Sequence, residues 1–215
     1  ISYIVTGVVW RWLLNPGTTQ TGSSGVNLLF EKIGLPFLRW GWFTDPDIVR
    51  ILPDSAVGQF LARIGLVGLT SQYVGISLAM ISVVLAATWQ MSGYTMAMYL
   101  AGLRAIPDEL REAARVDGAS EVQIYRHIIM PLLTPITLSA VIILGHMSLK
   151  IFDLVVSMTG PGPAFATDVP AFFMFDTTFR GNNFAQGAAI AILLLVVVAV
   201  LVVPYLVSTN RTEAE

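Results

Sequence analysis

The sequence has 215 residues, of which 55% are hydrophobic and only 12% are charged, and its mean hydropathy is +0.72. A water-soluble domain carries roughly 25% charged residues, so this composition excludes an ordinary soluble domain. The 12 Lys and Arg residues against 14 Asp and Glu residues leave no basic surface for a nucleic acid. The composition therefore predicts a protein of the lipid bilayer.

The residue inventory also excludes several kinds of catalytic and cofactor site. There is no cysteine, so a disulfide, a thiolate metal site and a cysteine nucleophile are all excluded. His127 and His146 are too far apart in the chain to share adjacent helical turns, so we expect no histidine metal site. Lys32 and Lys150 are each followed by isoleucine, so no P-loop is present. We therefore expect no cofactor in this chain, and any ATP hydrolysis that drives it must occur on another polypeptide.

Windows without charged residues predict the membrane helices. No Asp, Glu, Lys or Arg occurs in 64–103 or in 181–210, and a membrane helix needs about 20 apolar residues. The predicted spans are the end of a helix at 1–14 and complete helices at 73–102, 132–150 and 186–207. Because the chain opens inside an apolar stretch and without Met, we expect it to be incomplete at the amino end.

The segments between these helices differ in character. Gly, Pro and Asp turn residues predict a long extracytoplasmic loop at 15–72, with short amphipathic helices near 26–33 and 57–64. The connection 103–131 contains four arginines, whereas 151–185 contains only Arg180. By the positive-inside rule, the first connection is cytoplasmic and the second is extracytoplasmic. The remaining residues, 208–215, form a cytoplasmic tail.

The connection at 103–131 has the signals of two short helices joined by a bend. Asp108 and Glu109 complement a helix N-terminus, and this helix is expected to run to about Asp117. Gly118 can adopt the left-handed conformation that ends a helix, and Ser120 with Gln123 matches a capping box. The second helix should stop before a proline, with one apolar stripe made of Val122, Tyr125, Ile128 and Ile129. These signals fit a partner-binding hairpin and a solvated connection equally well.

One motif in this connection resembles a known family. The pattern EAA-x3-G-x9-I-x-x-P is matched by Glu112, Ala113, Ala114, Gly118, Ile128 and Pro131. It resembles the EAA loop of permease subunits of bacterial binding-protein-dependent ABC importers. AGLRAIPDEL at 101–110 and FDLVVSMTGPGPAFAT at 152–167 are similar to the sugar-importer branch, the maltose-type permeases. The chain departs from the family at Met130, where leucine is usual, and in an extra segment at about 48–70.

The resemblance implies an all-α, polytopic ABC importer type I permease core, without its first two helices. The hairpin would be the coupling helix, which fits a groove of a cytoplasmic ATPase dimer that holds ATP and Mg²⁺. Glu112 would make a charged contact, Ala113 and Ala114 would allow close approach, and Gly118, after Asp117, would form the bend. The other implied partners are a second permease subunit, an extracytoplasmic sugar-binding protein and lipid. The location implied is the plasma (inner) membrane of a bacterium or archaeon.

Polar and aromatic residues within the predicted spans suggest a substrate path, because polar groups in a bilayer tend to face a wet cavity or another helix. The candidates are Trp89, Gln90 and Tyr94 on one helix, and His146, Ser148, Lys150 and Asp153 along another. Alternative roles remain for each: a salt bridge between Lys150 and Asp153, a backbone hydrogen bond from Ser148, and packing of the aromatic rings.

The extracytoplasmic segments 15–72 and 159–170 are expected to dock the sugar-binding protein, with Trp42 and Phe165 as representative contacts. No arginine lies within a predicted span, which favours a neutral sugar over an anionic substrate. Glycerol phosphate or another polar solute is the alternative cargo. An ion-coupled secondary transporter, with only Asp153 and Asp176 available as carboxylates, and a purely structural membrane subunit are the other function classes.

Overall fold

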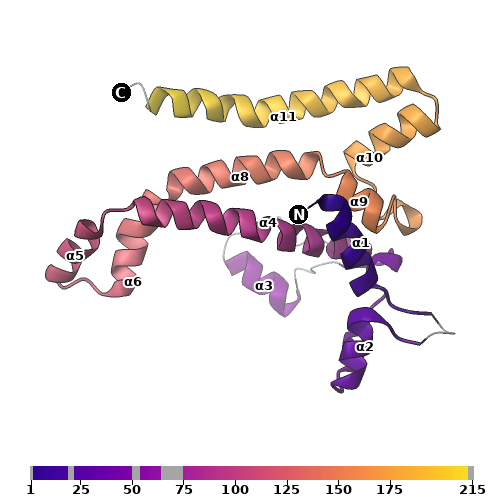
Figure 1. Ribbon diagram of the computed structural model, residues 1–215, viewed down its shortest axis with the longest axis horizontal. Helices are drawn as coiled ribbons and strands as arrows, with labels where there is room; N and C mark the ends of the chain where they lie inside the picture. Colours follow the sequence, from indigo (N-terminus) through magenta and orange to yellow (C-terminus); the bar gives the residue numbers. More distant parts are fainter. Residues whose placement is uncertain (1, 19–21, 50–53, 64–74, 213–215) are drawn as a thin grey trace. The chain divides into compact units, whose positions relative to one another are not determined.

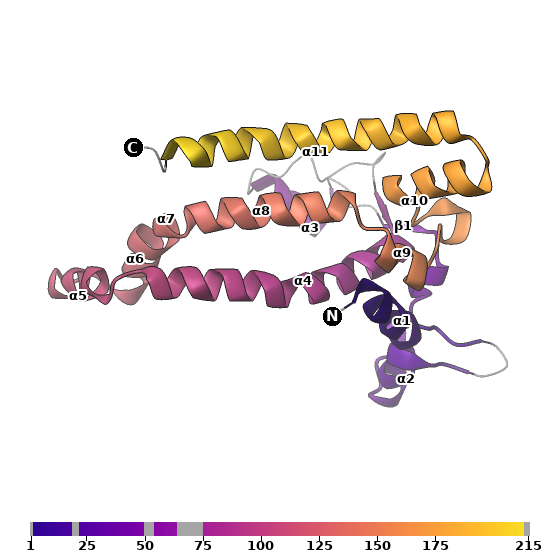
Figure 2. The same cartoon turned by 45° about the horizontal axis from the view of Figure 1, so that its top comes forward.

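Helices make up nearly all of the regular structure (Figures 1 and 2). The computed structural model describes residues 2–18, 22–49, 54–63 and 75–212. The α-helices are α1 (Tyr3–Leu13), α2 (Gly25–Lys32), α3 (Ala56–Arg63), α4 (Leu78–Ala105), α5 (Asp108–Val116), α6 (Glu121–Ile124), α7 (Met130–Leu132), α8 (Thr134–Leu149), α9 (Asp153–Met158), α10 (Pro170–Phe175) and α11 (Phe184–Thr212). The π-helical turns are η4 (Tyr125–Ile129) and η6 (Asp176–Arg180), and the 3₁₀ turns are η1 (Pro36–Leu38), η2 (Trp42–Thr44) and η5 (Pro163–Phe165). Strands β1 (Ile48–Val49) and β2 (Ile76–Ser77) form one antiparallel pair. The all-α prediction is therefore confirmed.

The chain divides into two compact units. The first unit comprises Ile1–Thr88 and Ile151–Phe184, and the second comprises Trp89–Lys150 and Ala185–Glu215. Helix α4 begins in the first unit and ends in the second.

The core of the first unit forms where α1 packs along α9. The two helices approach closely at Gly7, where an added Cβ would overlap the hydroxyl of Ser157. Leu14, Leu154 and Met158 are fully buried beside this contact. The start of α4 adds Val83 and its neighbours to the same apolar cluster. Glycine thus permits the approach, and burial of apolar side chains stabilises it.

Asn27 fixes the aromatic loop that follows α2. Its Oδ1 accepts hydrogen bonds from Nε1 of Trp42 at 2.8 Å and from the backbone N–H of Trp40 at 3.3 Å. Its Nδ2 donates to the Trp40 carbonyl at 2.9 Å. Asn27 is buried, and so is Trp42, which is held at a φ of 42°. One buried side chain therefore pairs the buried indole N–H of Trp42 and both backbone groups of Trp40.

The second unit contains the end of α4, the segment α5–α8 and most of α11. Here Gly102 of α4 lies against α8, since an added Cβ would overlap the side chain of Ile136. The Tyr99 hydroxyl donates to Oγ1 of Thr137 at 2.9 Å and so joins the same two helices. These contacts place the two ends of the connection 103–131 side by side.

The predicted helices are all present, with shifted ends. Helices α1, α4, α8 and α11 lie where 1–14, 73–102, 132–150 and 186–207 were predicted, and residues 73–74 lie outside the described part of the chain. Helices α2 and α3 lie where short helices were expected within 15–72. The extra segment at 48–70 is described only over 48–49 and 54–63.

The described helices differ in whether they are long and apolar enough to span a bilayer. One of them, α11, is long and apolar enough to cross a bilayer, over Phe184–Pro204. The bent pair Glu121–Leu132 and Thr134–Leu149 also qualifies if it counts as one span. Helix α4 was predicted as a span and does not qualify, since Gln90, Ser92 and Tyr94 lower its hydropathy. Its middle is more polar than an ordinary lipid-facing helix.

The prediction that the second hairpin helix stops before Pro131 is wrong. The helix continues through α7 to Leu132, and the two flanking segments meet there at an angle of 58°. The π-helical turn η4 precedes the proline. A wider turn at this position relieves the clash that a proline ring makes with the preceding turn of an α-helix. The bend therefore falls after the proline, at Leu133.

Replacing Asn27 with alanine should destabilise the first unit. The Trp42 indole N–H would lose its acceptor, and the backbone N–H and carbonyl of Trp40 would lose their partners. The free energy of unfolding should fall by about 2–4 kcal/mol. Thermal unfolding in detergent, followed by tryptophan fluorescence, measures this loss. Asn15→Ala is the control, because Asn15 is exposed and bonds the nearby Gly17 N–H. An equal shift in both variants would contradict the role of Asn27.

Candidate coupling hairpin

The first helix of the hairpin, α5, ends in the conformation that its sequence predicts. Gly118 has a φ of +80°, in the left-handed region. Its N–H donates to the Arg115 carbonyl at 3.0 Å, and the N–H of Ala119 donates to the Ala114 carbonyl at 2.9 Å. These bonds satisfy carbonyls that the helix end would leave open. Asp117 lies at this end as its capping residue.

The second hairpin helix, α6, begins with the predicted capping box. Oγ of Ser120 accepts from the Gln123 N–H, and Oε1 of Gln123 accepts from the Ser120 N–H at 2.8 Å. An ion pair joins the two helices across the bend, with Nε of Arg115 at 2.8 Å from Oε1 of Glu121. Arg115 lowers the pKa of the Glu121 carboxyl through this hydrogen bond and through its charge. The bend is therefore fixed by backbone, cap and charge together.

The inner face of the hairpin is an apolar cluster of its own. The buried members are Ile124, Ile129 and Leu133, and the half-buried side chains packed on them are Tyr99, Leu103, Ile106, Ala114, Ala119, Ile128 and Ile136. The predicted stripe is wrong in part, because Val122 is 75% exposed and Tyr125 is 53% exposed. The π-helical turn shifts the register, so that residues five apart share a face. Ile124 was missing from the predicted stripe, although its spacing of four residues from Ile128 is an ordinary helical signal.

The outer face of the hairpin carries part of the EAA motif. Glu112, Ala113 and Asp117 are exposed, whereas Ala114 packs on the inner cluster. The small side chain of Ala114 therefore lets α5 approach α6 within the hairpin. Ile128 is likewise half-buried, while Gly118 and Pro131 are exposed. Val116, at 87% exposure, is an apolar side chain on this surface that the sequence prediction missed.

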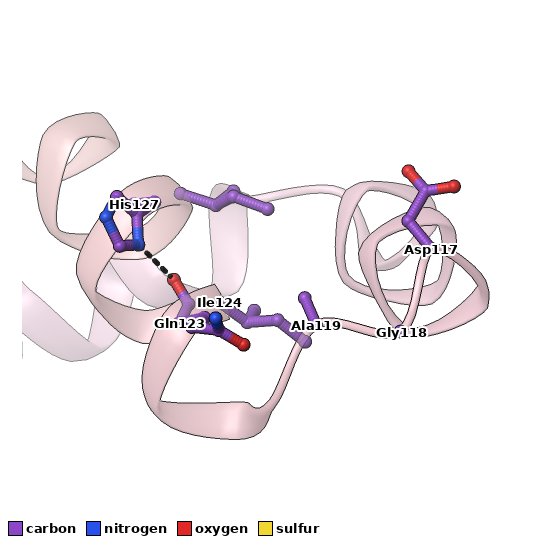
Figure 3. Close-up of a pocket in the computed structure, with 7 residues that line it drawn as sticks. Asp117, Gly118, Ala119, Gln123, Ile124 and His127 are labelled. Carbon is purple, nitrogen blue, oxygen red and sulfur yellow. Dashed lines mark hydrogen bonds between the residues drawn. The ribbon is translucent and has the colours of Figure 1, made fainter.

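A groove runs between the bend and the second helix (Figure 3). It has a volume of about 340 Å³ and is lined by Asp117, Gly118, Ala119, Gln123, Ile124, His127 and Ile128. Nδ1 of His127 lies 3.1 Å from the Gln123 carbonyl, on the opposite side from Asp117 in the figure. The groove thus offers a carboxylate, an imidazole and an apolar floor to a neighbouring surface.

The candidate substrate-path residues differ in their exposure. On α4, Trp89 and Tyr94 are exposed and Gln90 is half-buried. On α8, Nδ1 of His146 is buried and has no hydrogen-bond partner among the described residues. Buried polar atoms are normally paired, so this imidazole is available to a ligand or to another subunit.

The prediction that His146, Lys150 and Asp153 lie along one helix is wrong. Helix α8 ends at Leu149 and α9 begins at Asp153, so the stripe of His146, Lys150 and Asp153 is not one continuous helical face. Oγ of Ser148 donates to the Gly145 carbonyl at 2.8 Å, which is the backbone role that was the alternative for this residue.

The two residues chosen for the extracytoplasmic docking face differ in exposure. Trp42 is buried, at 8% exposure, because Asn27 and the first core hold it. It cannot serve as a surface contact, which corrects that expectation. Phe165 is 72% exposed and has a φ of 60°, an uncommon conformation for a bulky residue. Oγ1 of Thr167 donates to Oγ1 of Thr159 at 2.9 Å, which closes the loop that carries Phe165.

Comparison with known proteins decides the family. The sequence profile of the family described as "Binding-protein-dependent transport system inner membrane component" matches residues 25–211. The chain belongs to this family. Its members are transport components of membranes rather than enzymes, as the EAA motif implied.

Several relatives resemble this member of the family over nearly its whole length. It is 42% identical over 214 residues to a probable ABC transporter permease of Pyrococcus horikoshii, covering 99% of the chain and 61% of that protein. It is 34% identical over 207 residues to the xylose/arabinose import permease of Haloferax volcanii, covering 96% of the chain and 54% of that protein. The chain therefore spans somewhat more than half the length of these relatives.

A solved structure supports the fold of this family member. The bacterial alginate ABC transporter, solved with a periplasmic protein that holds an alginate pentasaccharide, matches with a TM-score of 0.68. The match covers 99% of the chain and 61% of the other chain, at 21% identity. With the family profile, it confirms the ABC importer permease core predicted from the sequence.

The hairpin of this family member should be less stable at low pH. The folded-state pKa of Glu121 is below its ordinary value of 4.5, so the Arg115 pair stabilises the fold above that value. The stabilisation is lost as the pH falls through the lower, folded-state pKa. Hydrogen-exchange protection of residues 118–123, corrected for intrinsic rates, should fall slightly over this window, because the pair is exposed. The same fall in Glu121→Gln would contradict this origin.

Proposed function

We propose that the protein is a membrane-spanning permease subunit of an ATP-driven ABC importer, and that the hairpin couples it to a separate cytoplasmic ATPase. The observation that carries the proposal is the two-sided hairpin. Its inner face packs on the ends of α4 and α8 through Ile124 and Leu133, while Glu112 and Ala113 remain exposed on the outer face. Such a hairpin can bind a partner without giving up its own core.

The exposed face suits an ATPase surface by its chemistry. Glu112 supplies a charge that a basic residue of the ATPase would pair with, and Ala113 permits close approach of the backbone. Val116 and the groove beside Asp117 extend this surface. ATP and Mg²⁺ would be held by the ATPase dimer, because this chain has no P-loop. No residue of the hairpin has a catalytic role in this proposal.

The proposed cargo is a neutral sugar, delivered by an extracytoplasmic binding protein. The polar middle of α4, with Trp89, Gln90 and Tyr94, offers both planar polar groups and aromatic faces. His146 on α8, whose Nδ1 has no partner in the described part of the chain, supplies another polar group. The relative from Haloferax volcanii is named for xylose and arabinose import. Glycerol phosphate or another polar solute remains the alternative cargo.

Ion-coupled transport has less support. It needs a carboxylate that can bind and release an ion within a span. Asp176 is paired with Arg180 at 3.0 Å, and Asp153 is exposed at the start of a short helix. Burial raises the pKa of Asp168, and the charge of Asp176 adds to this, but Asp168 lies in the loop before α10. None of these three carboxylates offers a buried site in a long helix.

The remaining partners follow from the same assignment. A second permease subunit would complete the transmembrane path, and a sugar-binding protein would dock on the extracytoplasmic loops. The family description and the periplasmic protein in the alginate transporter structure support such a binding protein. The complex would lie in the plasma membrane of a bacterium or archaeon, with the hairpin on the cytoplasmic side.

Replacing Glu112 should uncouple the transporter from its ATPase. Proteoliposomes that contain all subunits and internal ATP should take up a neutral sugar, and Glu112→Ala should lower that uptake about tenfold or more, since a buried charged contact is lost. Glu109→Ala is the matched control, because Glu109 is exposed on the same helix. Gly118→Val, which strains the bend, should act like Glu112→Ala.

Two results would contradict this assignment. Wild-type vesicles that accumulate glycerol phosphate and no neutral sugar would change the cargo. Normal uptake and normal ATPase association in both Glu112→Ala and Gly118→Val would remove the coupling role of the hairpin.

Phe165 should contribute to docking of the binding protein. It is exposed and held by a closed loop, so Phe165→Ala should raise the Kd of the binding protein about tenfold without changing basal ATP hydrolysis. Phe165→Tyr, which keeps an aromatic ring at this exposed position, is the control and should leave the Kd unchanged. Photocrosslinks from position 165 that reach the ATPase would show that the assumed orientation is wrong.

A further inference from the structure

We propose that Tyr99 and Thr137 are positioning residues for coupling, because they clamp the bend before α8 to the end of α4. This inference rests on the proposed transport function. The clamp is a hydrogen-bond relay that runs from Tyr99 through Thr137 to the carbonyl of Leu133. Its role is to make the hairpin and the two long helices move together.

The relay is continuous in the second unit. The Tyr99 hydroxyl donates to Oγ1 of Thr137 at 2.9 Å. The Thr137 hydroxyl donates to the Leu133 carbonyl at 3.0 Å. A hydroxyl has one proton to donate and lone pairs to accept with, so Thr137 can serve both bonds at once. Valine at this position could serve neither.

Leu133 is the residue where the helix is interrupted. The segments Glu121–Leu132 and Thr134–Leu149 meet there at 58°. Pro135 follows at the start of α8 and has no N–H to donate to the preceding turn. The backbone therefore has fewer hydrogen bonds here than along a regular helix, which makes the bend a compliant point.

Leu133 also belongs to the hairpin. Its side chain is buried in the inner cluster with Ile124 and Ile129. Its carbonyl accepts the Thr137 hydroxyl and also the Thr137 N–H, at 2.9 Å. Leu133 thus contacts the hairpin through its side chain and α8 through its carbonyl. Tyr99 links α4 to the same site through its hydrogen bond to Thr137.

A close backbone approach reinforces the relay on the same side. Gly102 is three residues after Tyr99, and a Cβ there would overlap Ile136, the neighbour of Thr137. The two helices are therefore in contact both by packing and by hydrogen bonds. Without the relay, the hairpin could rock at Leu133 while α8 stayed in place. ATP would then be hydrolysed with less sugar transported.

The complete transporter in proteoliposomes tests this. The measured quantities are the sugar taken up per ATP hydrolysed, the ATPase rate and the melting temperature. Tyr99→Phe and Thr137→Val should each lower the uptake per ATP roughly three- to tenfold, the range for one lost hydrogen bond. The ATPase rate should persist. The uptake per ATP of the double variant Tyr99→Phe/Thr137→Val should equal that of Thr137→Val alone, because the two replacements interrupt the same relay.

Two controls separate coupling from stability. Thr137→Ser keeps the hydroxyl and should retain the wild-type ratio. Thr95→Val makes the same replacement one turn before Tyr99, where the hydroxyl bonds the Met91 carbonyl within α4. It should also leave the ratio unchanged. If Tyr99→Phe does not assemble, Thr137→Val against Thr137→Ser carries the test.

Several outcomes would overturn the inference. One is an unchanged uptake per ATP in both Tyr99→Phe and Thr137→Val. Another is a proportional fall of uptake and ATP hydrolysis, which indicates a merely structural role. A third is an equal loss in Thr137→Ser and Thr137→Val. Wild-type vesicles without any ATP-dependent sugar uptake would instead refute the proposed function and the inference with it.

Discussion

The structure depends first on the satisfaction of polar groups inside an apolar chain. A bilayer offers no water to unpaired backbone groups, and long helices satisfy these groups within their own segment. The hydroxyl side chains follow the same constraint. Those of Ser82, Thr95 and Ser148 donate to carbonyls of their own helices, at 3.2 Å, 3.0 Å and 2.8 Å. Two polar groups differ from this pattern. The Tyr99 hydroxyl bonds another helix, and Nδ1 of His146 has no partner among the residues that the structure describes.

The hairpin obeys a different constraint, because its outer face carries exposed charged residues and its inner face is apolar. Its charges complement the helix ends and pair across the bend, as Arg115 does with Glu121. Its buried apolar side chains, Ile124, Ile129 and Leu133, share the inner face, and the π-helical turn connects the first two of them. Ala114 of the EAA motif packs inward and Ala113 remains exposed, so the motif serves both the hairpin core and the surface offered to a partner.

Local signals predicted much of the hairpin, because its bonds join residues close in sequence. The left-handed Gly118 and the capping box of Ser120 and Gln123 were both found where the sequence placed them. The same signals failed at Pro131, where a π-helical turn moved the break to Leu133. They also misjudged Trp42, whose burial depends on an asparagine fifteen positions away. Short-range rules hold no information on such distant partners.

The sequence by itself indicated a membrane protein, its family and the positions of its helices. Charge-free length, turn residues and the EAA spacing are properties of consecutive residues, and they need no knowledge of packing. Only the tertiary structure decided which face of the hairpin is buried and that Tyr99 meets Thr137. These depend on helical register and on approaches such as Gly102 to Ile136, where the absence of one Cβ sets the distance between helices. A pattern along the chain cannot specify such a distance, because it arises from two segments that fold against each other.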